Sequence, residues 1–313
     1  MGFLTPRFLT LAAVVVMTAC RPQPSPTIVL DPALAPLIPH DTVILSGIRI
    51  DQLKKTELYT KLRAEGKLKP LADFERETGI DLEKKVFDIL LASNAKTAVA
   101  LVRVQFATEG TAGVEVPLGK PGAPRFGYKG YTLTGEDSEK GFAATYFNRS
   151  VIVAGPTPIV KSVIDSRDGS KGGPPKALLD RVKTIPSSNQ VWGVSFAGIQ
   201  TALPSEIPGP LGGLKSLPID IRSIVGAVDL SKGVKASAEI VSGDEKNAGK
   251  LNDAVKGIIG IGRLSTPDSA PELLKFYDAI QVTRERDTIR VAADVPMNLV
   301  EQVLAALSER KLI

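Results

Sequence analysis

Apolar and polar positions along the chain divide it into short elements with two different periods. Alternating or continuous apolar runs predict β-strands, and apolar residues spaced three to four apart predict helices. The predicted strands cover residues 42–50, 97–106, 125–134, 141–148, 150–154, 190–197, 219–229, 234–241, 279–284 and 288–295. The predicted helices cover residues 52–64, 68–78, 82–91, 158–167, 176–182, 245–257 and 296–308. Residues 107–124 show no periodicity and are predicted to form a loop.

The order of these elements predicts an α+β fold. Three units repeat a hairpin followed by a helix, over residues 142–164, 221–259 and 279–307. We therefore expect an antiparallel sheet with helices packed on one face. The strand and helix of residues 41–53 can be aligned with residues 189–201, which indicates two related β-α-β-β-α-like halves.

The division between the two halves is expected at a stretch rich in Gly and Pro. Residues 168–175 read Asp-Gly-Ser-Lys-Gly-Gly-Pro-Pro, which predicts a flexible joint. The first half then covers residues 40–168 and the second half covers residues 176–313.

The N-terminus has the pattern of a secretory signal over residues 1–19. One basic residue, Arg7, precedes the apolar run of residues 8–17, which is too short to span a bilayer as a helix. Small residues and Cys20, the only cysteine in the chain, come next. We expect the signal to be cleaved.

Met17-Thr18-Ala19-Cys20 resembles the lipobox of bacterial lipoproteins, with Met in place of the usual Leu. The resemblance implies cleavage before Cys20, a diacylglyceryl group on its thiol and acylation of the new amine. Several acyl chains form a stable membrane anchor, whereas one is marginal. The alternative is an ordinary signal peptidase site, in which Cys20 has no role.

The residues around the anchor predict its location and reach. Arg21 stands where many inner-membrane lipoproteins have Asp, which favours the periplasmic face of the outer membrane. Residues 20–39 contain six prolines and predict an extended tether of about 3.1 Å per residue. Such a tether would hold the body on the order of 50 Å from the membrane.

Composition narrows the functional classes. The formal net charge is +5, but Lys and Arg alternate with Asp and Glu and form no basic block, so no nucleic-acid partner is predicted. A lipidated Cys20 leaves no free thiol, and His40, beside the tether, is the only histidine. A single histidine excludes His-rich zinc sites, and its place beside the tether argues against Ser-His-Asp hydrolysis, so we predict no metal, cofactor or catalytic residue.

One apolar loop has two interpretations. Residues 204–218 carry Ile207, Leu211, Leu214 and Leu217 among Pro and Gly. The loop folds onto the body and covers the core, or it forms a patch that contacts a partner or the membrane.

The body also resembles a group of uncharacterised bacterial envelope proteins. The similarity lies in strand 42–50, in the helix motif of residues 71–82, and in Tyr128-Lys-Gly-Tyr131 followed by the strand of residues 148–155. The group has no assigned activity, so the resemblance implies an envelope protein without identifying a functional residue.

The sequence predicts a lipid-anchored envelope protein with a non-catalytic binding or scaffolding role. Its partners are the membrane, through the N-terminal lipid, and an envelope protein. The alternative is a periplasmic carrier of an apolar ligand or lipid. A hydrolase that uses carboxylates distant in the sequence ranks third.

Overall fold

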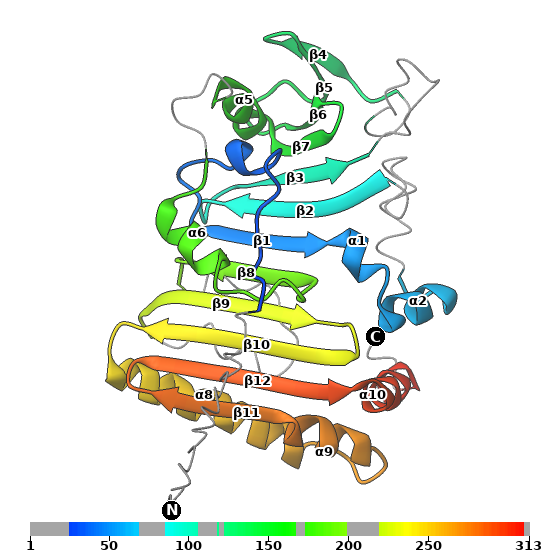
Figure 1. Cartoon of the computed structure of the whole chain (residues 1–313), viewed down its shortest axis with the longest axis vertical. Coiled ribbons are helices and arrows are strands. Elements are labelled where there is room, and N and C mark those ends of the chain that lie inside the picture. The colour runs from blue at the N-terminus through cyan, green and yellow to red at the C-terminus, as the bar shows by residue number, and fades with distance from the viewer. Residues whose placement is uncertain are drawn as a thin grey trace, which may run out of the picture.

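A twelve-stranded antiparallel sheet forms the centre of the molecule in a computed structural model (Figure 1). The structure describes residues 25–68, 85–105, 118, 122–166, 173–198 and 219–309. The strand order is β11-β12-β10-β9-β8-β1-β2-β3-β7-β6-β5-β4. The strands are β1 (Ile44–Arg49), β2 (Val86–Ser93), β3 (Ala98–Val104), β4 (Arg125–Tyr128), β5 (Tyr131–Gly135), β6 (Phe142–Asn148), β7 (Val151–Pro156), β8 (Val191–Ser195), β9 (Ile221–Asp229), β10 (Gly233–Ser242), β11 (Ile280–Glu285) and β12 (Thr288–Pro296).

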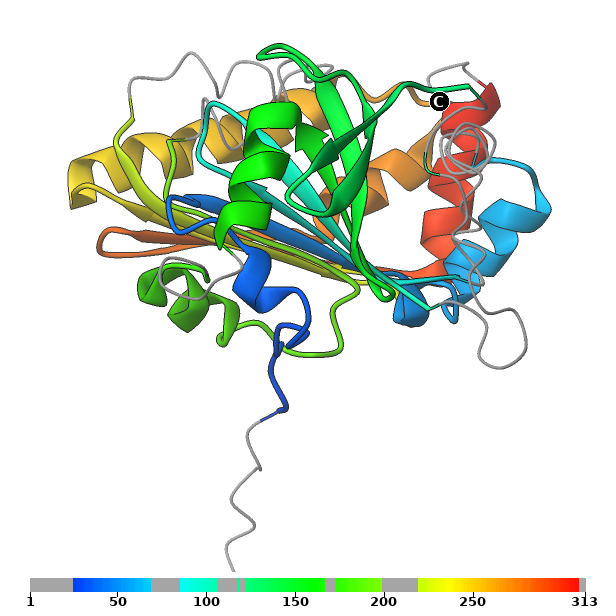
Figure 2. The same ribbon diagram turned by 90° about the horizontal axis from the view of Figure 1, so that it is seen from above.

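Helices lie on both sides of this sheet (Figure 2). They are η1 (Ala35–Leu37), α1 (Ile50–Leu53), α2 (Glu57–Ala64), α5 (Thr157–Asp165), α6 (Lys176–Val182), α8 (Glu245–Leu264), α9 (Pro271–Asp278) and α10 (Met297–Glu309). Thr56 caps α2 by accepting a hydrogen bond from the Tyr59 amide, and Asp244 caps α8 in the same way from the Asn247 amide.

The main helix layer covers a different sheet face in each part of the molecule. We call one face the strap face; Leu45, Leu101 and Trp192 on it pack with η1, α5 and α6. We call the other the α8 face; Ile240 and Ile289 on it pack with Leu251 of α8. Val225 and Ala227 of β9 join the first cluster, and Ile221 and Ile224 join the second. The main helix layer therefore changes sides at β9, although Val102 of β3 and Ile152 of β7 are also buried on the α8 face.

Strand β1 joins the two ends of the sheet. It pairs with β2 on one side and with β8 on the other, so Gly47 lies opposite both Leu90 and Trp192. The largest core cluster contains residues from before and after residues 168–175, including Val153 and Leu178. The two parts of the chain thus share one sheet and one principal core.

The predicted fold class, α+β with an antiparallel sheet and packed helices, is confirmed. Hairpins β6–β7, β9–β10 and β11–β12 are each followed by a helix, as the three repeated units predicted. Helices α5 and α6 cover the strap face, whereas α8 covers the opposite one.

The helix predicted over residues 82–91 is wrong from Val86 onward, because residues 86–93 form β2. Strand β2 is hydrogen-bonded to β1 and to β3 along its length, and Val86, Leu90 and Ala92 are buried. Two flanking ladders satisfy the backbone groups that a helix would satisfy internally, so tertiary pairing decides the conformation.

Two other predicted elements are divided in the structure, and one helix was not predicted. The expected helix 52–64 is broken into α1 and α2, because Thr56 starts a new helix. The expected strand 125–134 is two strands, β4 and β5, joined at Lys129 and Gly130, which both have positive φ. Helix α9 was not predicted. The predicted helix 68–78 lies almost entirely outside the described residues.

Candidate functional site

The N-terminal segment of the described chain is bound to the body. Residues 25–38, which we call the strap, run across β8, β1 and β2 on the strap face (Figure 1). The Ile28 amide donates to the Ile185 carbonyl at 2.8 Å, and the Ser187 amide donates to the Pro26 carbonyl at 2.8 Å. The expectation of an extended tether over residues 20–39 therefore needs correction, since the strap from Ser25 onward is docked.

Apolar side chains hold the strap in place. Ile28, Leu34, Leu37 and Ile38 are buried in the largest core cluster, whereas Val29 is 85% exposed. Burying a side chain of this kind stabilises the fold by about 1.5–3 kcal/mol. This exceeds the roughly 0.5–1 kcal/mol of side-chain entropy that an Ile or Leu loses on burial. The prolines of the segment thus accompany a docked conformation rather than a spacer.

Local hydrogen bonds at Asp31 shape the turn into η1. The Asp31 side chain accepts from the Ala33 amide at 2.7 Å, and its carbonyl accepts from the Leu34 amide at 3.0 Å. The second carboxylate oxygen lies 3.1 Å from Arg103 Nε on β3. Asp31 therefore fixes both the strap turn and its register on the sheet.

A charged cluster lies beneath the strap. Asp88 of β2 lies opposite Arg49 of β1 and opposite Arg103 of β3 in the strand register. Arg49 Nη1 donates to the Ser187 carbonyl, and Arg103 Nη1 donates to the Ser150 carbonyl at 2.9 Å. Both arginines thus join the sheet to loops on its strap face.

Burial raises the pKa of the Asp88 carboxyl to about 6, the Asp51 carboxylate adds to the rise, and Arg49 opposes it. The side chain borders a cavity of about 180 Å³ that Asp31, Leu34 and Trp192 also line. Asp88 can exchange a proton near pH 6. The described residues lining this cavity include no serine, cysteine or histidine.

His40 lies at the end of the strap and is exposed. It lines a cavity of about 110 Å³ together with Asp41, Asn94 and Ser162. Asn94 Nδ2 donates to Asp41 Oδ2 at 2.8 Å, so this carboxylate is already hydrogen-bonded. Over the described ranges, no three His, Cys, Asp or Glu side chains gather as a metal site.

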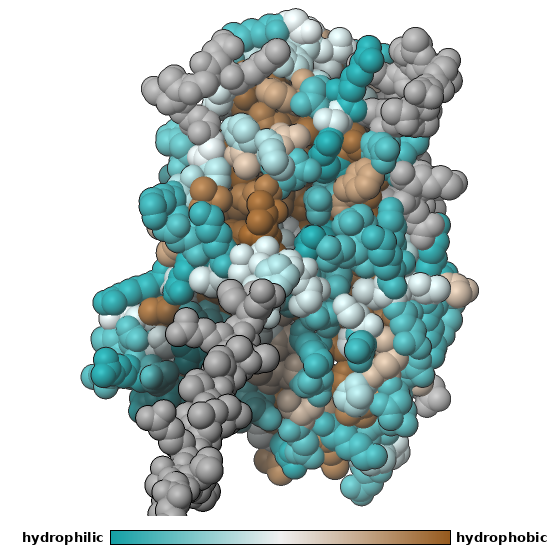
Figure 3. Space-filling view, in the orientation of Figure 1, coloured by the Kyte–Doolittle hydropathy of each residue, from teal (hydrophilic) through white to brown (hydrophobic). Residues whose placement is uncertain are grey.

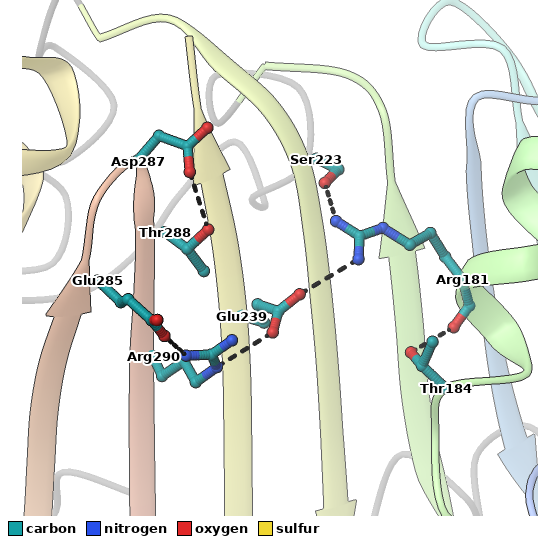
Figure 4. A network of polar contacts seen from close by, with 8 residues as sticks. All are labelled: Arg181, Thr184, Ser223, Glu239, Glu285, Asp287, Thr288 and Arg290. Carbon is teal, nitrogen blue, oxygen red and sulfur yellow. Dashed lines mark hydrogen bonds and ion pairs between the residues drawn. The ribbon is translucent and has the colours of Figure 1, made fainter. Parts of the chain in front are cut away.

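Polar side chains cover the strap face beyond β9. Glu239 of β10 accepts from Arg181 of α6 and Arg290 of β12, both at 3.2 Å (Figure 4). Arg290 also lies 3.1 Å from Glu285, and Arg181 donates to Ser223 at 2.8 Å. Charges of alternating sign thus join four strands to α6, and Figure 3 shows mostly polar residues over this lower part of the face.

The α8 face carries exposed apolar residues on β1, β2 and β6. Ile48, Leu91 and Phe142 are 36%, 46% and 61% exposed, and all three point to this face. Small residues lie in one row with Leu91 across neighbouring strands, on one side Gly226, Gly193 and Ser46 and on the other Ala100, Ala154 and Ala144. A Cβ added at Gly193 or Gly226 meets nothing closer than 3.6 Å, so the described structure leaves this row shallow.

The residues selected from the sequence as sites lie outside the described part of the chain. This holds for Cys20 and for the loop residues Ile207, Leu211, Leu214 and Leu217. Sequence reasoning missed the strap, although Ile28, Leu34, Leu37 and Ile38 occur there at a density that a solvated linker does not need.

Within the described ranges, no helix combines the length and apolar character needed to cross a membrane.

Comparisons with known proteins find a similar layout only. No family model and no curated protein matches the sequence. Solved structures of TP0453 in crystal forms I, III and IV are similar, with 9% identity and TM-scores of 0.43, 0.47 and 0.43. The alignments cover 88–90% of this chain and 97–99% of those chains. This similarity is too low to indicate a function for the present chain.

Proposed function

We propose that this is a bacterial envelope protein anchored by a lipid on Cys20, with a non-catalytic binding or scaffolding role. The docked strap is the observation that best supports this role. It begins five residues after Cys20, so the body stays within about 18 Å of the anchor even when the intervening chain is fully extended. A protein tied this closely is suited to work at the membrane surface.

The charged and polar groups on the strap face also support a non-catalytic role. Arg49, Arg103, Glu239 and Arg290 are engaged in contacts that join elements of the fold. His40, the one histidine, is at the surface and away from Asp88 and its cavity. These groups are used for structure rather than assembled around a substrate.

Mass spectrometry of the protein isolated from bacterial membranes tests the anchor. We expect a chain that begins at Cys20 and carries a diacylglyceryl group and an acylated amine. The Cys20→Ala variant should lose incorporation of a palmitate analogue and be released from the membrane fraction. Label that persists in this variant would contradict the proposal, and an unmodified Cys20 would support the ordinary signal peptidase site instead.

The second candidate function is a carrier of an apolar ligand or lipid, favoured by the exposed apolar residues on the α8 face. Exposed Leu91 stands within the row of small residues and exposed Ile48 lies beside it, and solvent-exposed apolar surface of this kind is typical of binding sites. Such a carrier would transport its ligand through the periplasm. The acyl chains of a bound lipid would lie along the row.

Native mass spectrometry of the protein without residues 1–20 separates the two candidates. A co-purified lipid that is lost in the Leu91→Asp variant would favour the carrier. Val29→Asp, which changes a strap residue that is 85% exposed, is the matched control and should keep the lipid. An apo protein that nevertheless retains an envelope protein partner would favour scaffolding.

A further inference from the structure

One part of the sheet presents a bare polar face. On the strap face of β10, β12 and β11, exposed residues occur at every second position: Lys235, Ser237, Arg290, Ala292, Asp294, Gln281, Thr283 and Glu285. Arg181 of α6 reaches this side of the strands through its ion pair with Glu239. The opposite side of the same strands is covered by α8 and α10.

The position of the strap limits where a lipid on Cys20 can be. Thr27 forms a bridge with Pro186, in the loop that leads into β8. Five residue steps connect Cys20 to Ser25, and they reach at most about 18 Å. The strap lies on the strap face. The outer surface of α8 lies on the other side of the sheet, beyond a helix layer about 10 Å thick (Figure 2).

We propose that the strap face of β10, β12 and β11 faces the lipid headgroup layer, and that the short link from Cys20 to the docked strap sets this orientation. The proposal rests on lipidation of Cys20. An anchor on this side brings the polar strands toward the membrane and turns α8 away from it. The exposed apolar residues of the α8 face then point away from the membrane that holds the protein.

The charges of this surface fit a headgroup layer without requiring an anionic one. Lys235 pairs with Asp294 at 3.1 Å, and Arg290 pairs with both Glu239 and Glu285. Cations and anions therefore neutralise each other along the strands, and surface pairs of this kind add little net attraction. The orientation should depend on the anchor and be nearly independent of salt and of the fraction of anionic lipid.

Fluorescence quenching on the lipidated protein tests the orientation. Lipidation consumes the only natural thiol, so a Ser237→Cys variant offers one labelling site on the strap face. Ser265→Cys, at the exposed C-terminal end of α8, is the matched control. Each variant is labelled with a small fluorophore and placed in phosphatidylcholine vesicles that contain lipids spin-labelled at the headgroup. We expect several-fold stronger quenching at position 237 than at position 265.

A lengthened link distinguishes anchoring from direct attraction. Inserting about 20 Gly and Ser residues after Pro24 adds an average reach of about 25 Å. The quenching difference should then disappear while the protein remains bound to the vesicles. A difference that survives the insertion, or equal quenching without it, would overturn the proposal.

The outcome also separates this inference from the proposed function. If intact-mass measurement finds no lipid on Cys20, the anchor itself fails. If the lipid is present and the two positions are quenched equally, the anchor holds and the orientation is wrong.

Discussion

The two ends of the sheet carry their main helix layers on opposite faces, although the first end also buries Val102 and Ile152 on the α8 face. From β1 to β7, the strap face is covered by the strap, η1 and α5, and its core includes Leu101. From β10 to β12, the strap face is polar and is reached by Arg181 of α6, while α8 covers the other side around Leu251. One continuous ladder of strands therefore carries two different layer arrangements.

The difference shows what fixes the side on which a helix packs. In strands, successive side chains point to opposite faces, so the placement of apolar residues at odd or even positions selects the buried face. Strand β9 has apolar residues in both sets, with Ile224 on one face and Val225 on the other. It can therefore join two arrangements without a break in the sheet.

The largest expected effect comes from breaking either core. Leu101→Ala and Leu251→Ala should each lower the free energy of unfolding by about 2–5 kcal/mol, because both side chains are fully buried. Urea unfolding followed by circular dichroism and by fluorescence of Trp192, the only tryptophan, checks this. If both ends form one cooperative unit, Leu251→Ala shifts both signals equally. A shift in circular dichroism alone would show that the ends unfold separately.

A smaller effect is expected at the strap. Ile28→Ala removes a side chain that is 4% exposed and should cost about 2 kcal/mol of stability, the low end of the range because the strap can collapse into the space. Val29→Ala is the matched control, with a change below about 0.5 kcal/mol. Equal effects in the two variants would mean that the strap is not docked in solution. Urea midpoints measure both.

Substitutions at two glycines show how crowded each sheet face is. A Cβ at Gly47 would overlap the buried Trp192 ring on the strap face, so Gly47→Ala should destabilise the protein by about 1–3 kcal/mol. Gly226→Ala places its Cβ on the α8 face in open space and should be neutral or stabilising by up to about 1 kcal/mol. Thermal unfolding compares the two, and a large loss in Gly226→Ala would contradict the shallow row.

The ionisation of Asp88, beneath the strap, makes the free energy of unfolding depend on pH. The unfolded carboxyl ionises near pH 3.8 and the folded one near pH 6, so the folded state binds more protons between these values. Stability therefore falls as pH rises from about 4 to 6. Asp88→Asn should remove this decline and gain about 1 kcal/mol at pH 7, a value reduced for partial exposure. Unfolding free energies at pH 4, 5, 6 and 7 measure it, and an unchanged profile would contradict the assignment.

The smallest effect is expected in the polar network beyond β9. Glu239→Gln weakens the ion pairs to Arg181 and Arg290 and should cost about 0.2–1 kcal/mol, since these groups are partly exposed. The loss should shrink when unfolding is measured in 1 M salt. A cost that is large and independent of salt would show a buried role for Glu239.

Much of the fold could be predicted from local patterns. Alternating apolar residues located β9, β10 and β12 closely, and Asp244 marked the start of α8. The strand β2 could not be found this way, because its apolar run also suits a helix and only pairing with β1 and β3 selects the strand.

The candidate site was harder to predict than the fold. Prolines favour extended backbone both in spacers and in docked segments, so the strap could not be told from a tether by its prolines. Its docking depends on Ile185, Arg103 and Trp192, which are distant in the sequence. The pKa of Asp88 likewise depends on burial that the sequence does not display.

The central position of β1 has a consequence for how the protein folds as it is synthesised. Ile48 must pair with Val191, so the strand made first completes its hydrogen bonds only after β8 has emerged. Until then, one side of β1 is a bare edge strand that can pair with other chains. Long-range pairing of this kind is slow, which lengthens the exposure. A chain that ended after β7 would keep that edge permanently and should aggregate, so the pairing of β1 with β8 protects the newly made chain from misassembly.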